Sequence, residues 1–149
     1  PFVGPAGKLL DKALIAAGIE RGEAYVTNIV KHFKWEPRGK RRIHKKPNAL
    51  EITACRPWFE AEVAALKPDI VICLGATAAQ AILGKDFRVS KQRGELITGG
   101  AYAPLIMATV HPSSILRAPD EKARRSETEA FIRDLKTAAK AIHKKLKAA

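Results

Sequence analysis

Short apolar runs separated by helical patterns are the feature that most restricts the fold of this chain. Residues 69–74 and 105–110 each resemble a buried strand, and residues 25–30 are rich in β-forming side chains. Helical patterns lie at 5–18, 48–66, 75–84 and 121–146, and a small hairpin is expected at 88–98. Strands that alternate with helices imply right-handed crossovers and a parallel sheet covered on both faces. We therefore predict one α/β domain over residues 1–149, a three-layer α/β/α sandwich with a mainly parallel central sheet.

The charge of the chain indicates a polyanionic partner. Its 149 residues include 27 Lys and Arg against 15 Asp and Glu, which gives a net charge of +12 and a pI near 10.0. This excess favours nucleic acid, with a membrane surface as the alternative. No segment has the roughly 18 apolar residues of a spanning helix, and the start lacks a signal-peptide pattern. We expect a cytoplasmic protein, acting as a monomer, that binds DNA.

Three junctions place polar or small residues where a parallel sheet binds its ligands. Asn28 interrupts the apolar stretch at 25–30, and a buried amide there would need hydrogen-bond partners. Gly75 directly follows the next apolar run, and His111 directly follows the last one. Ligands of open α/β sheets bind at the carboxyl ends of the strands, so these are candidate site residues. The ordinary alternatives are a satisfied core amide at Asn28 and a simple turn at His111.

Residues 33–47 are predicted to form a basic loop. Seven Lys or Arg lie between Lys34 and Lys46, against the single Glu36. The centre of this loop reads Lys40, Arg41, Arg42, Ile43, His44, Lys45. Such a cluster would bring DNA phosphates to the imidazole of His44, and the adjacent cations favour its neutral, nucleophilic form. The alternative is a solvated charged loop whose histidine only titrates in water.

Several segments, in the right order along essentially the whole chain, resemble the family 4 uracil-DNA glycosylases. They are Phe2-Val3-Gly4, Thr27-Asn28-Ile29-Val30-Lys31, Leu74-Gly75-Ala76 and His111-Pro112-Ser113-Ser114-Ile115-Leu116-Arg117. The segment at residues 40–45 looks like the signature of the UdgX branch of that family. The resemblance implies an enzyme that excises uracil from DNA, including single-stranded DNA.

The resemblance also implies roles for single positions. Phe2 matches the aromatic residue that stacks on the flipped uracil, and Asn28 matches the amide that reads the edge of the base. His111 matches the histidine near uracil O2, where a donor stabilises negative charge on the departing base. The implied DNA contacts are the positioning charges Lys40, Arg41 and Lys45, the backbone grips Ser113, Ser114 and Arg117, and a wedge at Ile115 or Leu116.

In the UdgX branch, the histidine at the position of His44 attacks C1′ of the deoxyribose after uracil leaves, which tethers the protein to DNA. N-glycosidic cleavage passes through a cationic sugar, and a nearby neutral imidazole can capture it in competition with water. Arg42 would hold the loop over the site, with phosphate contact as its alternative role. The resemblance thus predicts an enzyme that acts once and stays attached through His44.

The sequence departs from the family pattern in two respects. Family members carry a Gly-Glu-rich motif after their first strand, and the sequence begins after that position, so we expect a missing first strand and exposed sheet edges. Family members also hold a 4Fe-4S cluster, two of whose ligands match His32 and Cys55, with the other two expected from the missing N-terminal segment. The alternatives are a loop histidine near DNA and a buried helical thiol. Cys73 lies in an apolar run and is expected to be a core side chain.

Two other functions stay open. A noncatalytic DNA-binding module would show salt-dependent binding without preference for uracil and without base release. An ordinary hydrolytic glycosylase, in which His44 only contacts phosphate, would release free abasic DNA over many turnovers.

Overall fold

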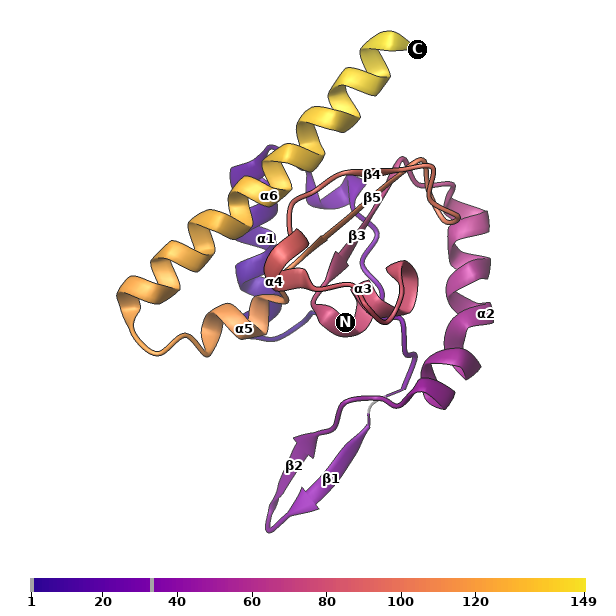
Figure 1. Ribbon diagram of the computed structural model, residues 1–149. Coiled ribbons are helices and arrows are strands. Elements are labelled where there is room, and N and C mark those ends of the chain that lie inside the picture. The colour runs from indigo at the N-terminus through magenta and orange to yellow at the C-terminus, as the bar shows by residue number, and fades with distance from the viewer. Residues whose placement is uncertain (1, 33) are drawn as a thin grey trace.

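A small mixed β-sheet lies at the centre of the computed structural model, which describes residues 2–32 and 34–149 (Figure 1). Its strands are β3 (Ile70–Leu74), β4 (Ile97–Thr98) and β5 (Leu105–Thr109), in the order β3-β5-β4. β3 and β5 are parallel, whereas β4 pairs antiparallel with the other edge of β5. The sequence predicted β3 and β5 at these positions, and the α/β fold class is confirmed.

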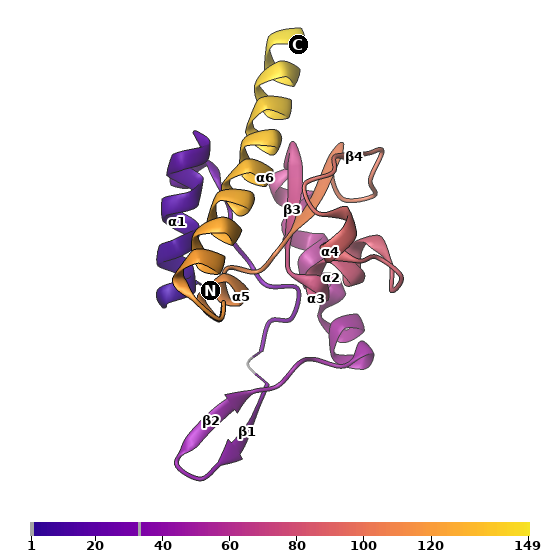
Figure 2. The same cartoon turned by 60° about the vertical axis from the view of Figure 1, so that its left-hand side comes forward.

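Helices cover both faces of this sheet (Figures 1 and 2). One face carries α1 (Pro5–Ala17), α5 (Pro112–Leu116) and α6 (Glu121–Ala148). The other carries α2 (Ala49–Leu66), α3 (Ala76–Leu83) and α4 (Val89–Gln92). Side chains alternate along β3, so Ile72 and Leu74 pack towards α1 and α6, whereas Val71 and Cys73 pack towards the opposite helices. A strand that is apolar on both sides therefore produces the predicted layers.

Local signals fix the helix ends as the sequence indicated. The Asn48 side chain accepts a hydrogen bond from the Glu51 amide, and Glu51 in turn accepts one from the Asn48 amide, which completes a capping box for α2. Gly18 ends α1 in the left-handed conformation, with φ +77°. Among the helices that the structure describes, none is long and apolar enough to cross a membrane.

Two predicted β segments are wrong. Residues 25–30 do not form a strand, because a β-forming sequence makes a strand only where a neighbour offers backbone partners. They follow a short 3-10 helix, η1 (Arg21–Glu23), and pass the open edge of β3 without pairing. Residues 88–98, expected to form a hairpin, instead form α4 followed by β4. The Arg88 amide donates to the Gln92 side chain, which supports the short helix. The Gly94 amide then donates to the Ala108 carbonyl, which brings the chain alongside β5.

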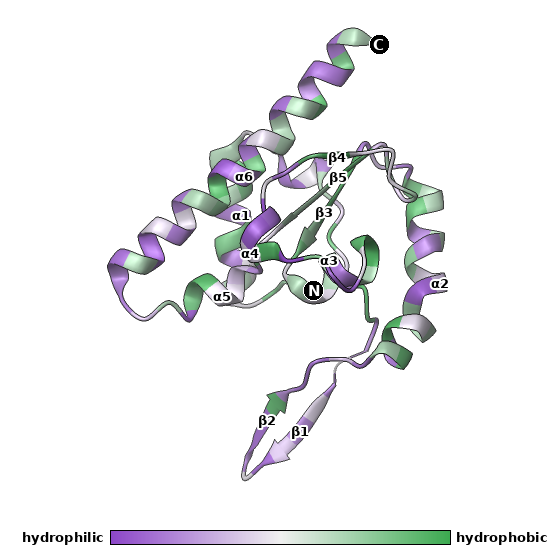
Figure 3. Ribbon diagram, viewed as in Figure 1, coloured by the Kyte–Doolittle hydropathy of each residue, from purple (hydrophilic) through white to green (hydrophobic). Residues whose placement is uncertain are grey.

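The basic segment expected to be a loop is a two-stranded hairpin, β1 (Trp35–Arg38) and β2 (Arg41–His44). Gly39, with φ +61°, allows the tight turn between the strands. The hairpin projects away from the sheet in both views (Figures 1 and 2), and most of its residues are hydrophilic (Figure 3). Phe33, the first residue of the predicted loop, lies outside the described residues.

Candidate functional site

The carboxyl ends of β3 and β5 meet at one edge of the sheet and bring two of the predicted site residues together. Leu74 lies opposite Thr109 in the parallel register, and the amide of Gly75 donates to the Thr109 carbonyl at 2.8 Å. A Cβ at Gly75 would lie only 3.0 Å from Cβ of His111, and the backbone there has φ +91°. Glycine at position 75 is therefore what lets the backbone approach His111 so closely.

His111 is held by its neighbours in one tautomer. Its Nδ1 accepts a hydrogen bond from the Ser113 amide at 3.1 Å and lies 2.7 Å from the Ser113 hydroxyl. Both contacts suit an acceptor at Nδ1, so the ring proton resides on Nε2. Burial lowers the pKa of His111 below its ordinary value of 6.5, and the positive charges of Arg117 and of His44, when His44 is protonated, lower it further. At neutral pH the residue is a neutral imidazole with Nε2–H as its donor.

This lowered pKa predicts a pH dependence of stability. The unfolded chain binds a proton at His111 near pH 6.5, whereas the folded protein resists protonation until a lower pH. The stability that His111 contributes is therefore full above pH 6.5 and is lost as the pH falls from 6.5 through the folded pKa. Urea unfolding between pH 5 and 8 should show a smaller acid-side loss of stability in His111→Gln than in the unchanged protein. Equal slopes in the two proteins would contradict the pKa shift.

Phe2 stacks on the ring of His111. The ring centroids are 5.2 Å apart with an angle of 26° between the planes. Phe2 has φ +59°, and a side chain at Gly7 would overlap with the Phe2 backbone carbonyl, so Gly7 makes this conformation possible. The aromatic residue and the histidine predicted for the site thus form one stacked pair.

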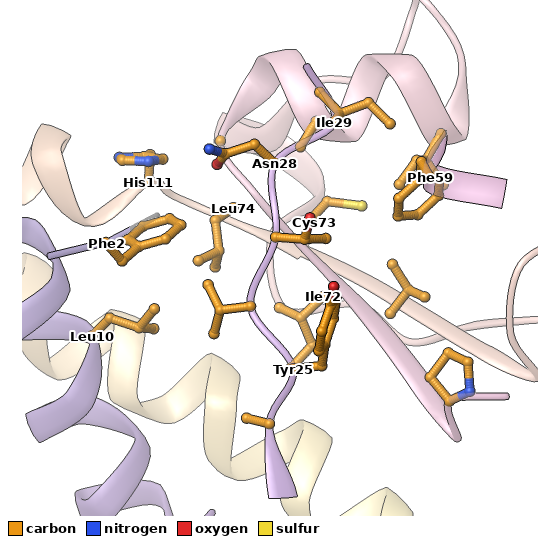
Figure 4. A pocket seen from close by; sticks show the side chains of 18 of the residues that line it. Phe2, Leu10, Tyr25, Asn28, Ile29, Phe59, Ile72, Cys73, Leu74 and His111 are labelled. Atoms are coloured by element: carbon orange, nitrogen blue, oxygen red, sulfur yellow. The ribbon is translucent and has the colours of Figure 1, made fainter. Parts of the chain in front are cut away.

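Asn28 lies across from this pair. Its side-chain amide points into the same cavity as His111 and Phe2 (Figure 4). Asn28 is exposed, so the expectation of a buried amide is wrong, because the segment that carries it is not part of the sheet. An exposed amide facing a cavity is available to a ligand.

Glu62 on α2 anchors the segment that carries Asn28, a role that no sequence pattern predicts. Its carboxylate accepts from Lys31 Nζ at 2.7 Å and from the Thr27 hydroxyl at 3.2 Å, and Lys31 Nζ also donates to the Asn28 carbonyl at 2.6 Å. Although burial raises the pKa of Glu62, the hydrogen bonds and the Lys31 charge lower it overall. Nothing in the local sequence distinguishes Glu62 from the nearby Glu60.

One cavity of about 1410 Å³ connects these residues. It exceeds the roughly 300–1,000 Å³ of most small-molecule sites, so a single base would fill only part of it. One end lies at Phe2, Asn28 and His111 (Figure 4). From there the cavity follows the open edge of β3 between residues 24–31 and the second half of α6.

The hairpin brings His44 to this cavity but keeps Arg42 elsewhere. His44 ends β2, lines the cavity, and lies near enough to His111 for its charge to lower the pKa of His111. Arg42 Cζ instead lies 4.6 Å from the ring centroid of Trp35 within the hairpin. Lys45 pairs with Glu36 at 3.1 Å, while Lys40 and Arg41 lie at the exposed tip.

The residues after His111 divide into core and surface. Ile115 is 1% exposed and packs with α1 and α6, so its assignment as a DNA contact is corrected: it belongs to the core. Leu116 is 36% exposed, and Arg117 is exposed. The Ser113 hydroxyl supports the His111 ring, and the Ser114 hydroxyl donates to the His111 carbonyl at 2.7 Å. Leu116 and Arg117 are therefore the members of this segment best placed to reach a ligand.

The two predicted cluster ligands lie together. His32 Nδ1 is 3.8 Å from Cys55 Sγ, which also accepts from the Lys31 amide at 3.4 Å. Within the described ranges, no group of three or more His, Cys, Asp or Glu side chains is arranged to hold a metal ion. Burial raises the pKa of Cys73 to about 12, which confirms the prediction that this thiol is a core side chain.

Comparison with known proteins identifies the family. The family model described as the Uracil DNA glycosylase superfamily matches residues 1–136. The chain is 35% identical to the type-4 uracil-DNA glycosylase of Pyrobaculum aerophilum over 126 residues, which cover 80% of this chain and 60% of the relative. It is 36% identical to the type-4 uracil-DNA glycosylase of Thermotoga maritima over 128 residues, 84% of this chain and 62% of the relative. The chain thus spans about six tenths of the length of these curated relatives, and it belongs to the uracil DNA glycosylase superfamily.

Proposed function

We propose that this protein is a monomeric, cytoplasmic uracil-DNA glycosylase of the UdgX branch of family 4, which excises uracil and becomes joined to the abasic DNA through His44. The observation that carries the proposal is the convergence of Phe2, Asn28 and His111 on one end of a cavity, with His44 lining the same cavity. The similarity to two type-4 uracil-DNA glycosylases supports the choice of substrate.

Each side chain has chemistry that suits this reaction. The stacked ring of Phe2 offers an apolar face to a flipped base, and the exposed amide of Asn28 offers both a donor and an acceptor to the base edge. As the C1′–N1 bond breaks, its electron pair leaves with uracil. The Nε2–H of neutral His111 can donate to the oxygen that gains this charge. A fixed tautomer makes that donor available without rearrangement.

The tethering step uses the cation left on the sugar. A lone pair of the neutral His44 imidazole forms a bond to C1′, and the resulting imidazolium then loses its other ring proton to solvent. The product is a neutral imidazole-sugar linkage that has no good leaving group at neutral pH. The enzyme would therefore stay attached after one turnover.

Denaturing gel electrophoresis of the full-length protein with labelled, uracil-containing single-stranded DNA tests this proposal. We expect a slowly migrating protein–DNA band that His44→Ala abolishes. The matched control is His143→Ala in the last turns of α6, at the end of the cavity away from His111, which should keep the band. Multiple-turnover release of free abasic DNA would instead establish ordinary hydrolysis, and salt-dependent binding without uracil release would establish a noncatalytic module.

The same proposal includes a 4Fe-4S cluster. The thiol of Cys55 and the imidazole of His32 are donors that iron accepts, and they come within 3.8 Å of each other. Two further thiolates, which the family resemblance implies, would have to come from outside residues 1–149. When bound, such a cluster would cross-link the segment that carries Asn28 to α2, a structural contribution, and we assign it no step of the reaction.

We further propose that an extended segment from outside residues 1–149 pairs with the open edge of β3. The cavity along that edge is lined by apolar side chains of β3, α1 and α6, including Ile72, Leu14 and Leu135. A strand edge beside an apolar groove is suited to strand addition. A strand there would give residues 25–30 the neighbour they lack and would end beside His111, where the implied acidic motif is needed.

A further inference from the structure

The two faces of the β1–β2 hairpin differ in chemistry. Residues directly opposite each other in an antiparallel pair have their side chains on the same face. The register therefore gives one face to Trp35, Pro37, Arg42 and His44. The cation–π contact between Arg42 and Trp35 agrees with this division. The other face holds Glu36, whose carboxylate is paired with Lys45.

The face that carries Trp35 has the chemistry of a nucleic-acid contact. Trp35 is 42% exposed, whereas tryptophan side chains in folded proteins are usually more buried. Arg42 holds its guanidinium 4.6 Å from the centre of the ring. Glu36 is the only acidic residue between Lys34 and Lys46, and it lies on the opposite face. An exposed indole with an adjacent cation is suited to a base and its phosphate, respectively.

We propose that Trp35 stacks on an unpaired base of single-stranded DNA, next to the nucleotide whose sugar lies at His44. This inference rests on the proposed function in taking DNA as the ligand and in placing a sugar at His44. Trp35 and His44 are direct cross-strand partners, and such partners have Cβ atoms about 4.5–5.5 Å apart. A strand that brings one sugar to His44 therefore brings a neighbouring base within reach of the indole. Arg42 orients the ring and neutralises the phosphate between the two nucleotides.

Fluorescence tests this stacking directly, because the chain has two tryptophans, Trp35 and Trp58. Trp58 lies on α2, is 67% exposed and does not line the cavity. In the full-length Trp58→Phe protein, Trp35 is the one of these two tryptophans that still fluoresces. A thymine-only single-stranded oligonucleotide, which contains no uracil, should quench this emission in a saturable way. The Trp35→Phe protein is the matched control, and its Trp58 emission should not change.

Affinity for the same oligonucleotide separates stacking from packing. Trp35→Ala should weaken binding by about 5- to 150-fold, which corresponds to the loss of one stacked base. Trp58→Ala should leave the affinity nearly unchanged, and Trp35→Phe should retain most of it. Trp35→Leu, which keeps apolar volume without an aromatic face, should bind as weakly as the alanine variant. The Trp35 effect should persist at high salt, whereas the effect of Arg42→Gln should diminish.

The outcomes separate this inference from the proposed function. Unchanged Trp35 emission at saturating DNA, or a leucine variant that binds as well as the unchanged protein, would overturn the stacking site. Quenching without uracil release would support the stacking site and contradict the proposed activity. Uracil release and adduct formation without quenching would support the proposed activity and contradict the stacking site.

Discussion

Replacing His111 with leucine is expected to slow uracil release by about 10²–10³-fold, the usual cost of removing one donor from a developing negative charge. The imidazole is neutral because burial lowers its pKa and the positive charge of Arg117 lowers it further. Its Nδ1 is engaged by Ser113, so Nε2–H is its donor towards the cavity. Leucine keeps a side chain of similar size against Phe2 but has no hydrogen to donate. The loss should therefore fall on the rate of the chemical step.

Single-turnover measurements on the full-length protein, with uracil-containing DNA in limiting amount, check this prediction. His143→Leu provides the matched control, because it changes the same residue type in the last turns of α6, at the end of the cavity away from Phe2, Asn28 and His111. DNA binding by His111→Leu should stay within about threefold of the unchanged protein, since the substitution removes no positive charge at neutral pH. A rate that falls less than about tenfold would mean that His111 holds the fold of the site and donates nothing to the base.

Ser113 offers a second test of whether His111 is held with its ring proton on Nε2. Its hydroxyl and amide both face Nδ1 of His111, and the amide contact survives in Ser113→Ala. We expect this variant to slow uracil release only several-fold, because one of two constraints on the ring is lost. A loss as large as that of His111→Leu would indicate that the Ser113 hydroxyl itself contacts the substrate.

The parts of the site that the sequence predicted are those set by local chain direction. Two apolar runs separated by a helix predicted parallel strands, and parallel strands end at the same edge of a sheet. Gly75 and His111 directly follow those runs, so their meeting required no knowledge of side-chain packing. The glycine that allows the close approach was visible in the sequence for the same reason.

The remaining features depend on contacts between distant segments. Residues 25–30 have the composition of a strand, but pairing needs a neighbour, and composition carries no information about one. Ile115 and Leu116 are adjacent apolar residues, and only the direction of α5 decides that Ile115 enters the core. The importance of Trp35 arises from its register with His44, which required the hairpin to be known.

Replacing Asp134 with alanine is expected to destabilise the folded protein by about 3 kcal/mol, because it breaks a partly buried charge network at the end of β5. One oxygen of Asp134 accepts from Arg93 Nε at 2.8 Å and from the Thr109 hydroxyl at 2.5 Å. The side chains of Arg93 and Asp134 are 20% and 14% exposed, and Thr109 is fully buried. The variant leaves the Thr109 hydroxyl without this acceptor and Arg93 with Glu127 as its remaining carboxylate partner.

The matched control for Asp134→Ala is Asp69→Ala. Asp69 also forms an ion pair, with Lys145 at 2.8 Å, but both side chains are nearly half exposed. Exposed pairs of this kind contribute about 1 kcal/mol or less, so Asp69→Ala should barely change the midpoint of urea unfolding. In a domain of this size, a loss of 3 kcal/mol lowers Tm by roughly 6–12 °C. Equal effects of the two substitutions would mean that the network is solvated. A selective loss for Asp134→Ala would show that the end of β5, which carries Thr109 and leads into His111, depends for its stability on this charge network.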